Sequence, residues 1–253
     1  MRRTTAFKVL LGFLAFGVVN LIAGREWKQA RELIAVAVFF GLLFVLVRWR
    51  DQPRRRAMEA EARRLRMGYT AEDRSGLLDQ GCQLFRSTRP FYGEVENVVS
   101  GSWHDFEVRS FDHSYSVSKD ERRLLSCVQV AIPGGWPTLV IRPETGFTRV
   151  ADLAVPDIAF ESEVFNRAFA VRCHDRAFAS ALVDPRMMEW LLSLDPHWSF
   201  EIDGTWILGY RDQVQPWEIE VVLETVESFI RRIPRAVTSL YPEAMPPRPD
   251  VSA

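Results

Sequence analysis

The chain has 253 residues and a formal net charge of −1 at pH 7, but its charge is unevenly distributed. Residues 1–66 carry 14 Lys or Arg and 5 Asp or Glu, a net +9, whereas residues 67–253 carry 18 basic and 28 acidic side chains, a net −10. Affinity for nucleic acid comes mainly from Lys and Arg. The composition of the larger part therefore argues against a DNA- or RNA-binding role.

Two uncharged apolar runs, residues 9–24 and 33–47, open the chain and are separated by a short polar turn. As helices they reach about 22–24 Å, so flanking residues have to complete a hydrocarbon core of about 30 Å. We predict a two-helix transmembrane hairpin with spans at about 6–24 and 32–49. A cleaved signal peptide is the alternative for the first run, but a small-x-small cleavage site is missing.

Eight arginines follow the second run and give residues 48–66 a net charge of +5. Positive residues of this kind favour the cytoplasmic side, which predicts a two-pass inner (plasma) membrane protein, N-in and C-in, with its soluble domain in the cytoplasm. We expect a basic helix in this segment to contact anionic lipid headgroups, at about 1 kcal/mol per basic residue. The predicted contact residues are Arg48, Arg50, Arg54, Arg55, Arg56, Arg63, Arg64 and Arg66.

Beyond residue 68 the pattern changes to short alternating segments typical of strands. Residues 96–100 and 105–111 predict a hairpin. Residues 124–132 and 138–142 predict two strands separated by the turn PGGWP. Asp203-Gly204 predicts a second, two-residue hairpin between residues 200–202 and 205–208.

Helices are also predicted towards the C-terminus. Asp184-Pro185 has the form of an N-cap followed by a first-turn proline. Residues 216–233 carry one apolar stripe, with acidic residues at the start and Arg231 and Arg232 at the end, which predicts a long amphipathic helix. The fold class predicted for the soluble part is therefore α+β with antiparallel strands. The expected segments are the hairpin (1–49), a basic juxtamembrane helix (50–67), the α+β domain (68–240) and a disordered tail (241–253).

The stretch FESEVFNRAFAVRCHDRAFASALVDPRMMEW, residues 160–190, concentrates polar groups that could form a site. Glu161 and Glu163 precede a predicted strand at 168–173, and His174 and Asp175 follow it. Six extended residues span roughly 20 Å, too far for the first shell of one metal ion. We therefore interpret Asp175 as a helix N-cap, and predict no catalytic, cofactor-binding or metal-binding residue.

Other parts of the sequence also lack the patterns of a catalytic, cofactor-binding or metal-binding site. Cys82, Cys127 and Cys173 form no C-x-x-C pair and are expected to be reduced and buried. The sequence contains no Walker A, G-x-G-x-x-G, G-x-S-x-G or H-E-x-x-H motif, so no cofactor is predicted.

With two N-terminal spans, an Arg-rich collar and the segments FESEVFNRAFAV and FASALVDPRMMEWLL, the chain resembles an uncharacterised, mainly actinobacterial family of membrane-anchored proteins of unknown function. The resemblance implies a cytoplasmic domain on a membrane hairpin and carries no activity or catalytic residue with it.

The leading functional hypothesis is a non-enzymatic, membrane-anchored interaction module that binds a protein partner. A membrane-tethered hydrolase using His104, His113 and His174 is the alternative from a different class, and convergence of two of these histidines would favour it. A third hypothesis is a lipid- or small-ligand-binding domain with an apolar void. Ala37 and Gly41 have the spacing of a helix-packing motif, which leaves a homo-oligomer as an open alternative.

Overall fold

A computed structural model of the chain describes residues 35–36, 38–39, 41, 52–79, 81–91, 93–118, 121–144, 157–195 and 198–242. Its contacts divide the chain into two compact units, residues 1–56 and 57–253. The strands of the second unit are β1 (Gly68–Glu72), β2 (Glu94–Trp103), β3 (Phe106–Ser116), β4 (Arg122–Pro143), β5 (Phe169–Cys173) and β6 (Ser199–Asp212). Its helices are η1 (Leu77–Asp79), α3 (Gln83–Thr88), η2 (Arg89–Phe91), α4 (Glu163–Ala168), α5 (Arg176–Leu182), α6 (Pro185–Ser193), η3 (Pro216–Glu218), α7 (Ile219–Arg232) and α8 (Arg235–Leu240).

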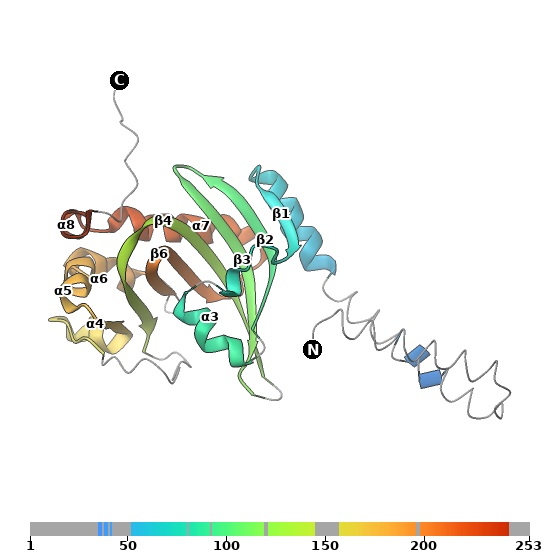
Figure 1. Ribbon diagram of the computed structural model, residues 1–253, viewed down its shortest axis with the longest axis horizontal. Helices are drawn as coiled ribbons and strands as arrows, with labels where there is room; N and C mark the ends of the chain where they lie inside the picture. Colours follow the sequence, from blue (N-terminus) through green and yellow to red (C-terminus); the bar gives the residue numbers. More distant parts are fainter. Residues whose placement is uncertain are drawn as a thin grey trace, which may run out of the picture. The chain divides into compact units, whose positions relative to one another are not determined.

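The strands form one antiparallel sheet of six members in the order β1-β2-β3-β4-β5, with β6 also paired to β4 (Figure 1). Strand β4 is 22 residues long. Its first half lies between β3 and β6, and its second half lies between β5 and β6. The antiparallel α+β class predicted for this part of the chain is confirmed.

Two strand predictions were wrong in the same place. Residues 124–132 and 138–142 belong to the single strand β4, and Asp203-Gly204 lies inside β6 instead of joining two strands. The register moves from Ala131↔Trp206 to Trp136↔Gly204, so β4 carries extra residues where Gly204 adopts φ +56°. The turn residues therefore build a bulge that bends both strands together.

One face of the sheet packs on the C-terminal helices, with α7 running behind it (Figure 1). The apolar stripe predicted for α7 is confirmed: Ile219, Val222, Leu223, Val226 and Phe229 are buried. Gly209 of β6 is required for this contact, because a Cβ there would lie 2.4 Å from Val226 Cγ2. This larger core covers that face of the sheet.

Among the described residues, the opposite face is covered over part of its area, by η1 and α3. Glu201 of β6 is buried at 1% exposure and fixes this cover. Its Oε1 accepts hydrogen bonds from Arg142 (2.7 Å) and from the Tyr210 hydroxyl (3.0 Å). Its Oε2 accepts from the backbone N–H of Leu84 (2.9 Å), in the first turn of α3. A carboxylate from a distant strand thereby caps a helix whose own N-cap residue, Cys82, makes no side-chain cap.

The predicted transmembrane hairpin is contradicted. Within the part of the chain that the structure describes, no helix has the length and apolar character needed to cross a membrane. Of the predicted spans at 6–24 and 32–49, only residues 35–36, 38–39 and 41 are described, and the rest lies outside the described residues. The physical weakness was length, since 15 or 16 apolar residues fall short of the roughly 20 that a span requires. The two-pass location in the plasma membrane, N-in and C-in, depended on those spans and is overturned by the same finding.

The helix over residues 52–64 corresponds to most of the predicted basic helix. Met58 and Ala62 from this helix and Met67 after it are buried in the larger core, at 3%, 0% and 8% exposure. Its C-terminal half is therefore part of the folded domain. The segment boundaries predicted from the sequence stay predictions.

Candidate binding site on the open sheet face

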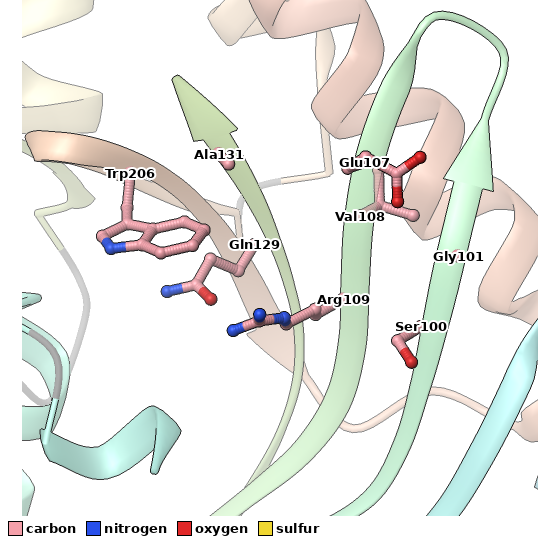
Figure 2. Close-up of a pocket in the computed structure, with 8 residues that line it drawn as sticks. All are labelled: Ser100, Gly101, Glu107, Val108, Arg109, Gln129, Ala131 and Trp206. Atoms are coloured by element: carbon pink, nitrogen blue, oxygen red, sulfur yellow. The ribbon is translucent and has the colours of Figure 1, made fainter. Parts of the chain in front are cut away.

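Beyond the area that α3 covers, the described residues leave a pocket on the same sheet face, and most of the side chains that line it are polar (Figure 2). Two adjacent rows of residues cross four strands here, because alternate residues of each strand point to one face. The cross-strand pairs place Ser100 opposite Arg109, Arg109 opposite Gln129, and Gln129 opposite Leu208. The next row contains the pairs Ser102–Glu107 and Ala131–Trp206.

These rows line a pocket of about 300 Å³, which we call the open-face pocket. Leu208 belongs to the core beneath α3, so the pocket begins where that core ends. The residues that line it are Ser100, Gly101, Glu107, Val108, Arg109, Gln129, Ala131 and Trp206.

Three side chains give the pocket its chemistry. Gln129 is buried at 1% exposure, and its Nε2 lies 4.0 Å from Cys82 Sγ beneath α3. The guanidinium carbon of Arg109 lies 5.5 Å from the centroid of the Trp206 ring, a cation–π distance. Figure 2 shows Arg109 extending from β3 towards Gln129 and Trp206. The guanidinium and the indole thus hold each other in place above β4.

The end of the β2–β3 hairpin, which carries one wall of the pocket, is fastened to α7. Glu227 accepts hydrogen bonds from Trp103 Nε1 (2.9 Å) and Arg231 Nε (2.6 Å) and pairs with His104 Nδ1 (2.7 Å). Arg231 also pairs with Asp105 at 2.9 Å. Burial alone would raise the pKa of the Glu227 carboxyl, but the hydrogen bonds from Arg231, His104 and Trp103 outweigh it and hold this pKa below its usual value.

The polar stretch singled out in the sequence builds structure instead of a pocket. Asp175 is the N-cap of α5, as predicted, and accepts from the Phe178 N–H at 2.9 Å. Its second oxygen accepts from the Tyr241 hydroxyl at 2.5 Å. That bond, followed by the capping bond, lowers the pKa of the Asp175 carboxyl. Glu163 lies on the exposed side of α4 and pairs with Arg167 at 3.0 Å.

The histidines considered for hydrolysis do not converge. His104 lies at the β2–β3 turn, and His113 lies on β3, seven residues beyond Phe106 and so about 23 Å further along the strand. His113 is fully buried, and burial lowers its pKa to about 4. His174 is exposed after β5, on a different part of the sheet. Among the described residues, no three His, Cys, Asp or Glu side chains are grouped to hold a metal ion.

The cysteines are free and buried, as predicted. Burial raises the pKa of the Cys82 thiol to about 12, with a further contribution from Glu201. A thiol held neutral in this way is a poor nucleophile.

The basic residues predicted to contact lipid are only partly described. Arg48 and Arg50 lie outside the described residues. Arg63 pairs with Glu59 at 2.8 Å, and Arg64 pairs with Glu61 at 2.6 Å and with Glu220 of α7 at 2.7 Å. Part of the basic charge is therefore neutralised within the fold, and contact with anionic headgroups stays a prediction.

Sequence reasoning missed the open-face pocket. The alternation of Glu107, Arg109 and Phe111 on β3 was visible and signals one strand face. What brings these residues together with Trp206 is the pairing of β4 with both β3 and β6. That pairing brings together positions almost one hundred residues apart, and no pattern of neighbouring residues in the sequence predicts it.

Comparison with known proteins finds a shared fold. No protein-family model and no curated protein matches the chain. Among solved structures, the mycobacterial trehalose monomycolate transport factor A, TtfA, is similar, with a TM-score of 0.55 and 14% sequence identity. The match covers 71% of this chain and 96% of the TtfA chain. At this identity the likeness concerns the fold, and it agrees with the actinobacterial side of the resemblance seen in the sequence.

Proposed function

We propose that the chain is a non-enzymatic binding factor that holds a partner or a cargo molecule in the open-face pocket without transforming it. The observation that carries the proposal is the lining of the pocket. It combines a guanidinium, a carboxylate, an amide and an indole, the groups that bind and orient a ligand, and its lining residues include no histidine or cysteine.

The name of the structural neighbour supports a role in transport. TtfA is named as a transport factor, and a factor of that kind would bind its cargo or a protein partner. We propose by analogy of fold that this chain is also an accessory to a transport process, with a protein partner as in the leading hypothesis from the sequence. Because one fold can host many functions, the proposal is tested at the pocket itself.

The experiment is affinity purification of the full chain from a whole-cell lysate of an actinobacterial host. Bound proteins and extractable small molecules are identified by mass spectrometry for the wild type, Trp206→Ala and Trp217→Ala. Trp217 is a matched control because it lies in η3, just before α7, is 66% exposed and does not line the pocket.

We expect at least one bound species to be retained by the wild type and Trp217→Ala and to be lost from Trp206→Ala. Retention of every species by Trp206→Ala would contradict the proposal. Recovery of the bound molecule in a chemically converted form would instead indicate an enzyme.

A further inference from the structure

The charges of the open-face pocket cancel. Glu107 and Arg109 are two residues apart on β3 and therefore point to the same sheet face. They are the two charged residues of the lining, one of each sign. A ligand with a net charge would meet a like charge in the pocket whichever sign it carried, which costs free energy. The lining thus favours a neutral ligand.

Arg109 presents hydrogen-bond donors that the fold leaves available. Among the described residues, no carboxylate forms an ion pair with it, and its guanidinium lies 5.5 Å from the centroid of the Trp206 ring. A guanidinium held near an aromatic face keeps its N–H donors in one planar fork. Such a fork suits two adjacent oxygen atoms on one ligand.

The other polar groups of the pocket would pair best with a ligand that carries both hydrogen-bond donors and acceptors. The Glu107 carboxylate accepts hydrogen bonds, and the Ser100 hydroxyl both donates and accepts them. Glu107 already accepts a hydrogen bond from the Ser102 hydroxyl and keeps acceptor sites for a ligand. A ring with neighbouring hydroxyls satisfies this set, because each hydroxyl accepts from Arg109 while donating elsewhere.

The remaining wall is apolar. The indole of Trp206 and the methyl group of Ala131 face each other across paired strands. The ring carbons of a saccharide carry outward C–H bonds of slightly positive charge, which pack favourably on the negative face of an aromatic ring. The volume of about 300 Å³ lies at the lower end of the range for small-molecule sites, about 300–1,000 Å³. This gives room for one or two sugar rings.

We infer that the open-face pocket binds a neutral saccharide of one or two rings. Arg109 donates to adjacent hydroxyls, Glu107 accepts from another, and Trp206 packs against the ring carbons. The inference rests on the proposed function, since it names the ligand class of the same pocket.

Saturation-transfer NMR on the full chain tests this inference. The probes are trehalose, maltose and sucrose as neutral disaccharides, with succinate and inorganic phosphate as anions. We expect transfer to the ring protons of at least one disaccharide, an affinity about tenfold weaker in Trp206→Ala and in Arg109→Ala, and no change in Trp217→Ala. Transfer to the anions alone, transfer to none of the probes, or a disaccharide affinity in both pocket variants equal to that of the wild type would overturn the inference.

Two further arms keep the outcome decisive. Should Trp206→Ala fail to fold, Glu107→Gln replaces it, because Glu107 is exposed and outside the core; an unchanged saccharide affinity there and in Arg109→Ala would again overturn the inference. The affinity purification separates the two proposals. Pocket-dependent capture of a partner without saccharide binding refutes the ligand class and leaves the binding factor standing, whereas capture that is independent of Trp206 refutes both.

Discussion

At the scale of single residues, His113 is a titratable group that the fold holds neutral. Its ring is fully buried, with Nδ1 3.1 Å from the Glu94 carbonyl and Nε2 2.9 Å from Thr88 Oγ1. Burial is the main reason why its pKa falls to about 4, and the positive charge of Arg122 lowers it further. The unfolded chain takes up this proton near pH 6.5. The contribution of the neutral histidine to the free energy of unfolding is therefore fully present above about pH 6.5. It decreases as the pH falls towards 4.

We predict that the wild type loses about 2 kcal/mol of unfolding free energy between pH 7 and pH 5 because of this histidine. Urea denaturation at both pH values measures the loss. The variant His113→Gln keeps a neutral hydrogen-bonding side chain and should lose clearly less over the same interval. An equal loss in the two proteins would assign the acid sensitivity to other groups.

At the scale of elements, the contact between α7 and the β2–β3 hairpin is organised by one carboxylate, Glu227. Because it pairs with Trp103, His104 and Arg231 together, neutralising it weakens several charge-assisted hydrogen bonds at once. We predict that Glu227→Gln speeds amide hydrogen exchange over residues 101–107 by about tenfold, equivalent to losing one net hydrogen bond. Hydrogen-exchange mass spectrometry measures this.

The control for that prediction lies on the same helix. Glu224 is exposed on α7, one turn before Glu227. Glu224→Gln makes the same chemical change and should leave exchange in the hairpin as it is in the wild type. Equal protection in both variants would show that apolar packing alone holds the hairpin on α7.

Elements with local signals could be predicted from the sequence. The stripe of α7 and the caps Asp175 and Asp184 depend on residues within a few positions of one another, and the structure confirms them. Asp203-Gly204 carried an equally local hairpin signal, but the hairpin prediction was wrong. The two residues lie inside β6, opposite the bulge of β4. Glu201 caps α3 from 117 positions away, so neither it nor the open-face pocket could be read from local pattern.

At the scale of the whole molecule, the position where the domain begins has an energetic consequence. The sequence placed the start of the α+β domain at residue 68, after the basic helix. In the structure, Met58, Ala62 and Met67 are buried in the core that also holds α7. Burying a methionine side chain contributes about 1.5–3 kcal/mol relative to leaving it exposed. The basic helix is thus held by its apolar side, and Arg64 adds an exposed ion pair with Glu220, a contribution of at most about 1 kcal/mol.

We predict that a fragment of residues 68–253 is less stable than a fragment of residues 52–253 by at least about 3 kcal/mol, the sum for two methionines at the lower value. Urea denaturation of both fragments, followed by circular dichroism, measures the difference. In the longer fragment, Met58→Ala should account for about 2 kcal/mol or more of it, whereas Arg64→Gln should cost less than about 1 kcal/mol. Equal stability of the two fragments would show that the helix contributes nothing to the fold. In that case the helix over residues 52–64 would serve contacts outside the domain, made by its basic side chains.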